Sequence, residues 1–271
     1  MIFVIHSQSN LYMEVALFFI ALVIFRLTYI IIRSVDMGKA IAALIKGEAV
    51  PVYFEWTPKR MPSHYEQFLY RNEKYYRELP PKRRKSYASR IMKFMDDKKF
   101  ETREGLVLTK EMLIMISSAA IKISFGLREY MFSSFHTIII YPDEFYSRTF
   151  KLKLKGQTNA RGVIVFSWKD LEFGNAIADD SINLGYHEFA HALFLEHFLQ
   201  PYEDEFKDHY REWLMFIKNN ASLNKVRQEH IFRNYATTNE MEFFAVALEN
   251  FFEKPIHFKQ ELPQLYAHMR I

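Results

Sequence analysis

The pentapeptide HEFAH at 187–191 is the feature that most limits what this chain can fold into. On an α-helix, residues four positions apart lie on one face, so His187 and His191 would point the same way and could share one metal ion. Glu188 would lie about 100° further round, near the ion without having to bind it. The spacing therefore predicts a helix that carries two metal ligands and a carboxylate able to act as a general base.

A site of this kind needs a third protein ligand. His197 stands six residues after His191, but Phe194 occupies the place where the long histidine motif has the glycine that turns the chain back. A helix that continues through Phe194 would rotate His197 about 240° away from His191, so we expect a solvent-facing or capping histidine there. The segment 239–255 is the better source of a ligand. It offers three glutamates, among which the residues alone do not choose: Glu240, Glu242 and Glu249.

Composition narrows the kinds of site and partner. The chain contains no cysteine, so disulfides and thiolate metal sites are excluded, and any metal must be held by histidine and carboxylate. The net charge of +4 is spread along the chain, and the run KRRK at 82–85 is the one dense basic stretch. Because Pro80 and Pro81 precede it, we interpret it as the solvated first turn of a helix rather than a surface for phospholipid or nucleic acid. No nucleic-acid partner is expected.

A long apolar segment, residues 11–33, lies near the N-terminus. Between Val15 and Ile32 its only charge is Arg26, and these eighteen residues would span about 27 Å as a helix, close to the thickness of a bilayer's hydrocarbon core. The segment is apolar on all faces, which favours a transmembrane helix over a buried amphipathic one. Lys and Arg residues follow it and none precedes it, so the positive-inside rule predicts the rest of the protein on the cytoplasmic side.

The remaining sequence predicts an α+β fold in which helices surround a small mixed sheet. We expect an N-terminal transmembrane anchor at 1–34, a connector at 35–61 and one globular domain at 62–271. Helices are expected near 85–99, 109–125, 181–199, 203–219, 239–253 and 257–269. Runs rich in Ile, Val and aromatic residues predict strands at Thr137–Tyr141, Phe150–Leu154 and Gly162–Trp168. Thr109 looks like a helix start, and Gly156, Asn159 and Gly162 predict a turn before the last strand.

Several spaced stretches resemble those of one known protein family. In chain order they are ARGVIVFSWKDLEFGNAIADDSINLGYHEFAHAL, NYATTNEMEFFAVALENFFEKP and LPQLYAHM. Together they look like the MtfA family of zincin metallopeptidases, the glucose-regulated peptidases, and the likeness covers roughly residues 62–271. The resemblance implies a zincin-like fold, Zn²⁺ as the cofactor and hydrolysis of peptide bonds.

The resemblance also implies roles for single residues. On the matching motifs, the zinc ligands fall on His187, His191 and Glu242. The catalytic glutamate falls on Glu188, which would activate a zinc-bound water. Tyr235, seven residues before the ligand glutamate, is similar to a tyrosine proposed to stabilise the transition state.

The chain departs from the usual family pattern in its predicted membrane helix, which is an addition relative to the soluble members, and at two places in the motif helix. After HEFAH it continues with Ala192, Leu193 and Phe194, where members of the family usually have a Leu-Asp pair, so any role of that aspartate is missing or supplied elsewhere. Gly185 replaces a typical β-branched residue within the motif helix. A glycine there costs helix stability of up to about 1 kcal/mol.

Two functions are compatible with these observations. The first is a membrane-anchored zinc peptidase, by its resemblance an aminopeptidase acting on peptide or protein substrates. The second is a zinc-stabilised regulatory protein that sequesters a protein partner such as a transcriptional repressor, since the family takes its name from such a titration. Glu188 favours the peptidase, because a purely structural metal site needs no carboxylate at that position.

Two other segments have alternative interpretations. The strand at 162–168 either pairs with an extended substrate along the cleft or belongs to the core of the sheet. Glu249 lies seven residues after Glu242, on the same helical face. It is expected either as a surface carboxylate or as the acceptor for the second N–H of a ligand histidine.

Overall fold

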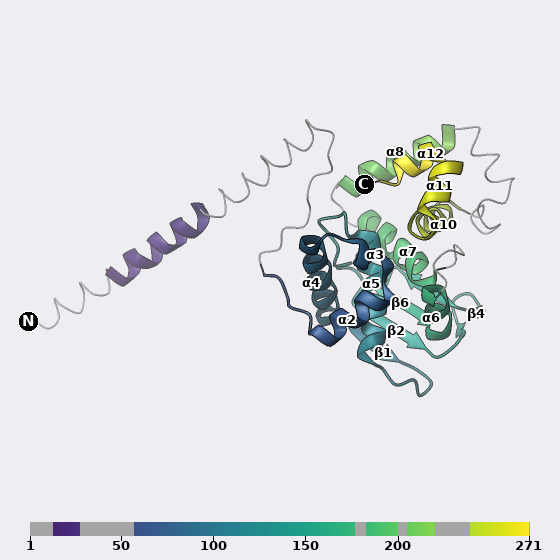
Figure 1. Ribbon diagram of the computed structural model, residues 1–271, viewed down its shortest axis with the longest axis horizontal. Coiled ribbons are helices and arrows are strands. Elements are labelled where there is room, and N and C mark those ends of the chain that lie inside the picture. Colours follow the sequence, from purple (N-terminus) through teal and green to yellow (C-terminus); the bar gives the residue numbers. More distant parts are fainter. Residues whose placement is uncertain (1–12, 28–56, 177–182, 200–204, 220–238, 271) are drawn as a thin grey trace, which may run out of the picture. The chain divides into compact units, whose positions relative to one another are not determined.

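The computed structural model describes residues 13–27, 57–176, 183–199, 205–219 and 239–270 (Figure 1). The chain divides into two compact units, Met1–Phe54 and Glu55–Ile271. In the first unit, residues 13–27 form a helix whose large apolar side chains are exposed. Among the described residues, no helix has both the length and the apolar character needed to cross a bilayer. The transmembrane helix predicted over 11–33 is thus not found in the described part, and both ends of that segment lie outside it.

A small mixed sheet lies within the second unit. In spatial order its strands are β1 (Lys99–Thr102), β2 (Thr137–Tyr141), β6 (Val163–Ser167) and β5 (Gly156–Asn159). The first three strands run parallel, and β5 runs antiparallel to β6. β6 is therefore paired on both sides, whereas β5 is an edge strand of this sheet. A separate antiparallel pair consists of β3 (Phe145–Ser147) and β4 (Leu152–Leu154).

Helices account for most of the rest of the second unit (Figure 1). They are α2 (Ser63–Asn72), α3 (Lys74–Glu78), α4 (Pro81–Asp97), α5 (Lys110–Ser124), α6 (Trp168–Ala176), α7 (Leu184–Leu199), α8 (Glu205–Asn219), α10 (Glu240–Glu253), α11 (Pro255–Glu261) and α12 (Pro263–His268). This is the mixed α+β architecture with a small sheet that the sequence predicts. The order along the chain is helices, strands and then helices again.

The main difference from the sequence-based prediction is the edge strand β5, where a turn was expected. The peptide Gly156–Asn159 reads as a turn because of its glycine and polar residues, yet it pairs along its whole length with β6. Pairing in the folded chain overrides weak local propensity for a strand. The turn itself lies later, at Gly162, whose φ is +82°. An added Cβ there would collide with the main-chain oxygen of Ser134, so the position requires glycine.

Local signals set several helix ends. The side chain of Thr109 accepts a hydrogen bond from the main-chain N–H of Met112 at 3.2 Å, so it caps α5 as predicted. At the C-terminus the single helix predicted over 257–269 is two helices, α11 and α12. Pro263 begins the second one, because proline has no N–H to continue the preceding helix and disfavours a helical residue before it.

The helix that carries HEFAH, α7, packs against the sheet and against several helices. The ring of Phe189 lies 5.6 Å from that of Phe166 on β6 and 5.9 Å from that of Phe94 on α4. Gly185 faces α5, where an added Cβ would lie 2.9 Å from the Cβ of Ala119. The glycine therefore allows close contact between α7 and α5, which compensates for its cost to the helix.

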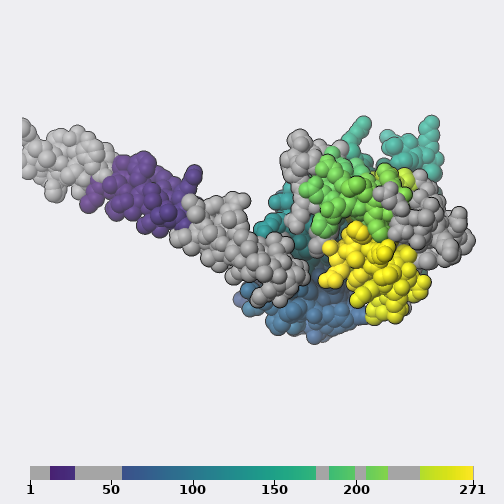
Figure 2. All heavy atoms as spheres, turned by 90° about the horizontal axis from the view of Figure 1, so that it is seen from above, coloured from purple at the N-terminus to yellow at the C-terminus, as the bar shows by residue number. Residues whose placement is uncertain are grey.

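Aromatic side chains join α8 to α10. Trp213 and Tyr210 of α8 lie within 5.4 Å and 5.3 Å, ring centre to ring centre, of Phe244 on α10. α12 also packs against α8. In the space-filling view α8, in green, lies beside the C-terminal helices, in yellow (Figure 2). This packing contributes to the position of α10.

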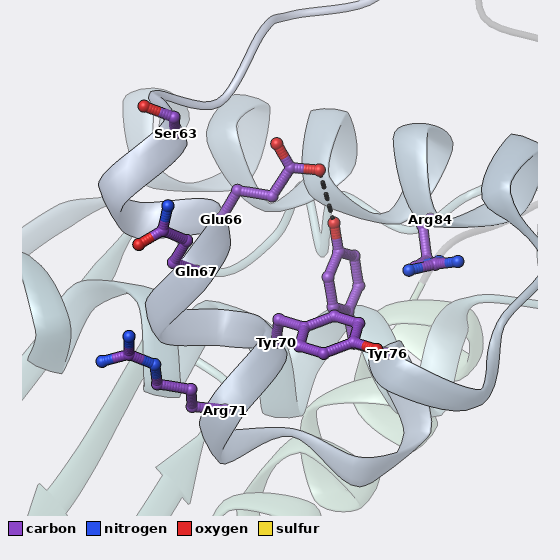
Figure 3. A pocket seen from close by; sticks show the side chains of 7 residues that line it. All are labelled: Ser63, Glu66, Gln67, Tyr70, Arg71, Tyr76 and Arg84. Atoms are coloured by element: carbon purple, nitrogen blue, oxygen red, sulfur yellow. Dashed lines mark hydrogen bonds between the residues drawn. The ribbon is translucent and has the colours of Figure 1, made fainter.

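A cavity of about 290 Å³ is lined by residues of α2, α3 and α4 (Figure 3). Across it the hydroxyl of Tyr76 donates a hydrogen bond to Glu66 at 3.0 Å, and burial raises the pKa of Tyr76. Arg84 also lines it and belongs to the KRRK run, which forms the first turn of α4 with its other three residues exposed. No residue of α7 or α10 lines this cavity, so it is separate from the site described next.

Candidate metal centre

α7 and α10 bring three side chains of metal-binding type together. His187, His191 and Glu242 each offer one ligand atom, and these atoms lie within 4.8 Å of one another. The two histidine Nε2 atoms are 3.1 Å apart. Oε2 of Glu242 lies 3.3 Å from Nε2 of His187, and Oε1 lies 3.4 Å from Nε2 of His191. The four-residue spacing in HEFAH accounts for the two histidines, and α10 supplies the carboxylate.

The start of α10 determines which glutamate faces the histidines. Asn239 caps the helix by accepting a hydrogen bond from the main-chain N–H of Glu242 at 2.9 Å, so Glu242 lies in the first turn. A carboxylate in the first turn interacts favourably with the helix dipole. Glu240, two residues earlier, is exposed and forms an ion pair with Lys218 at 2.8 Å. Of the three glutamates that the sequence offers, only Glu242 contacts both histidines.

Glu249 lies behind the first histidine. Its side chain is 1% exposed, and its Oε1 lies 2.6 Å from Nδ1 of His187. The expectation of a surface carboxylate is therefore wrong, and the alternative of a histidine partner is the one observed. Because an ionised carboxylate can only accept, Nδ1–H of His187 donates to it, and loss of the proton on Nε2 would free that nitrogen to bind a metal.

The distances within this group fit a small tetrahedral cation. Around an ion bound at about 2.0–2.1 Å, neighbouring nitrogen ligands in tetrahedral geometry lie about 3.3 Å apart. The observed separations of 3.1, 3.3 and 3.4 Å agree with that value. Two imidazoles and one carboxylate also leave a fourth position for water or substrate, as in catalytic sites.

The electrostatics of the group also favour a positive charge. Burial acts to lower the pKa of His187, but hydrogen bonds with Glu242 and Glu249 outweigh it and raise the pKa to about 10. Burial acts to raise the pKa of Glu242, but hydrogen bonds with His187 and His191 lower it to about 2. Both shifts show that the carboxylates stabilise a cationic charge between them, which a metal ion can provide.

Glu188 lies next to this group without belonging to it. Its side chain is buried, and burial raises the pKa of its carboxyl. The hydroxyl of Thr158, on β5, donates a hydrogen bond to its Oε2 at 2.8 Å. Glu188 is thus a carboxylate held beside a candidate metal site by the edge strand.

His197 is not a member of the group. It is buried rather than solvent-facing, and its ring stacks at 4.4 Å on Phe206 of α8. The expectation of exposure is wrong because it did not include α8, which packs over this end of α7. Tyr235 lies in 220–238, outside the described residues.

Two residues of the site, Gly156 and Thr158 on β5, were not predicted from the sequence. Both contact Glu188. Their spacing of two, which places side chains on one face of a strand, is the one signal that could have found them. It is too short a pattern to identify a strand by itself.

Comparison with known proteins identifies the family of this chain. The family model of the glucose-regulated metallo-peptidases, M90, matches residues 55–271. The chain belongs to this family. It is also similar to an uncharacterized protein of Synechocystis sp., with 24% identity over 250 residues that cover 81% of this chain and 88% of that protein. Membership of a metallopeptidase family implies a metal ion, for which His187, His191 and Glu242 provide a site.

The hydrogen bond from His187 to Glu249 predicts a measurable effect on metal affinity. Glu249→Gln keeps the size of the side chain but removes its negative charge, so it holds the Nδ1 proton less strongly. We expect metal affinity to fall about 10- to 100-fold, the usual effect of losing such a partner. Competition titration against a chelator would measure it. The matched control is Glu240→Gln on the same helix, which should bind metal as the wild type does; equal affinities for all three proteins would contradict the prediction.

Proposed function

We propose that this metallopeptidase-family protein is a zinc-dependent peptidase in which Glu188 is the general base. The observation that carries the proposal is the position of Glu188, which is buried beside the three candidate ligands and is not one of them. A structural metal site would not need a carboxylate there. Two imidazoles and one carboxylate are a common ligand set of catalytic zinc.

The residues have distinct roles in the proposed reaction. His187, His191 and Glu242 would hold the zinc ion. When bound, zinc supplies Lewis acidity, which lowers the pKa of water and polarises a carbonyl group. Glu188 takes a proton from the attacking water and passes it to the leaving amine. Tyr235 stays the predicted donor to the developing oxyanion, on resemblance to the family alone.

The strand that pairs with substrate is proposed to be β5 rather than the segment 162–168. β6, which that segment contains, is paired with β2 on one side and with β5 on the other. Neither side of the β6 backbone is therefore open to pair with a substrate. β6 belongs to the core of the sheet. β5 is an edge strand of that sheet and contacts Glu188 through Thr158. An extended peptide can add to such an edge by main-chain hydrogen bonds.

The family resemblance supports aminopeptidase activity on short or partly unfolded peptides. Membrane attachment through residues 11–33, with the peptidase domain on the cytoplasmic side, stays a prediction from the sequence. Its support is the apolar sequence and the exposed apolar side chains of the helix at 13–27. Protease protection in membrane vesicles tests it, and digestion of the domain at 55–271 from the outside would contradict the orientation.

Cleavage of a broad peptide pool by the full-length, zinc-loaded protein tests the proposed function. We expect cleavage that a chelator abolishes and added zinc restores. Peptides with blocked and free N-termini distinguish aminopeptidase activity from cleavage within the peptide. An aminopeptidase acts only on peptides with a free N-terminus. Zinc binding without cleavage of any peptide would instead support the regulatory protein that sequesters a partner.

A further inference from the structure

Two residues of β5 contact the carboxylate of Glu188. The hydroxyl of Thr158 lies 2.8 Å from Oε2 of Glu188 and 3.0 Å from its main-chain oxygen. Gly156 leaves room on the other side, because a Cβ added there would clash with Oε1 and lie 2.7 Å from Cδ and Cγ. Gly156 and Thr158 are two positions apart and therefore share one face of the strand. Residues of β5 thus lie against both oxygens of the carboxylate.

This contact matters because of where Glu188 lies in the chain. It is adjacent to His187, so its flexible side chain can reach toward the same ion that the histidines would bind. A carboxylate that binds the ion cannot serve as a base for the attacking water, which must lie within hydrogen-bond reach of a free oxygen. Among the described residues, Thr158 provides the one side-chain hydrogen bond to the Glu188 carboxylate. This hydrogen bond holds the carboxylate in its observed position.

We propose that Thr158 and Gly156 are positioning residues that keep Glu188 beside the metal ligands and prevent it from becoming one. Thr158 supplies the hydrogen bond that fixes the carboxylate, and Gly156 supplies the space. The inference rests on the proposed peptidase function, since it assigns how the base of that reaction is held. It also gives β5 a second role beyond pairing with substrate.

The test compares substitutions of Thr158 in the full-length, zinc-loaded protein. Thr158→Val keeps the shape of the side chain and its strand propensity but loses the hydroxyl. We expect kcat to fall about 10- to 100-fold with little change in KM, since substrate contacts are kept while the base is misplaced. Thr158→Ser keeps a hydroxyl and should restore kcat to within a few-fold of the wild type.

A matched control separates positioning from damage to the sheet. Thr102 is half-buried on β1, as Thr158 is on β5, and lies at the opposite edge of the same sheet. Thr102→Val should leave kcat unchanged. Gly156→Ala should lower kcat as Thr158→Val does, because the added Cβ occupies the place of the carboxylate. Thermal unfolding of each variant shows whether the fold is retained.

A second readout does not depend on activity. Crystal structures of the zinc-loaded variants should show the Glu188 carboxylate against β5 in the wild type and in Thr158→Ser, and displaced toward the ion in Thr158→Val. This result would stand even if no peptide is cleaved, so failure of the inference and failure of the proposed function are distinguishable. A carboxylate that stays in place in Thr158→Val, or a kcat equal to that of the wild type, would overturn the inference.

Discussion

Glu188→Gln is expected to lower kcat by about 100- to 10,000-fold, the range that a positioned general base contributes. Glutamine has the same shape and can still accept the hydrogen bond from Thr158, but it cannot take a proton from water. Zinc binding should stay within a few-fold of the wild type, because Glu188 is not one of the three candidate ligands. Steady-state kinetics on a cleaved peptide, together with zinc content of the same sample, measures both quantities.

Glu196→Gln is a matched control on the same helix. Oε2 of Glu196 accepts a hydrogen bond from the main-chain N–H of Ser134 at 2.7 Å, which glutamine can also accept. Its activity should equal that of the wild type. If Glu188→Gln lost zinc, Glu188 would be a ligand rather than the base. If it kept full activity, the proposed mechanism would be wrong.

Glu242→Ala is expected to have the largest effect on metal binding. The substitution removes one of the three candidate ligands and the negative charge nearest to both Nε2 atoms, which lie 3.3 and 3.4 Å from its oxygens. We expect zinc affinity to fall by more than the roughly 10- to 100-fold predicted for Glu249→Gln, since that residue acts only through a ligand. Zinc that binds the folded state raises its stability by mass action, so the zinc-dependent rise in Tm should also disappear.

The comparison for Glu242 is with Glu240→Ala in the same turn of α10. Glu240 is exposed and paired with Lys218, so its loss should change neither zinc affinity nor the zinc-dependent Tm. Chelator competition and thermal unfolding with and without zinc give the two measurements. Wild-type zinc affinity in Glu242→Ala would show that α10 does not supply the third ligand.

Much of the fold follows from local patterns. The hydrophobic periods predict most helices and the parallel strands β2 and β6, and the absence of cysteine restricts any metal to histidine and carboxylate. The elements that the sequence did not predict are short or polar; examples are β1, β5 and α6. Their apolar residues are too few for a period to be visible, and pairing or packing with distant segments stabilises them instead.

The sequence by itself determined that His187 and His191 share a helical face with Glu188 beside them, because a helix places residues four apart together wherever it lies. Motif resemblance added Glu242. Only the tertiary structure decided how these residues meet: Glu242 contacts both histidines, and Glu249 accepts from His187, because α10 packs on α7. It also decided that Thr158 holds Glu188. These contacts join residues 30 or more positions apart, and local periodicity carries no information about distances in space between such segments.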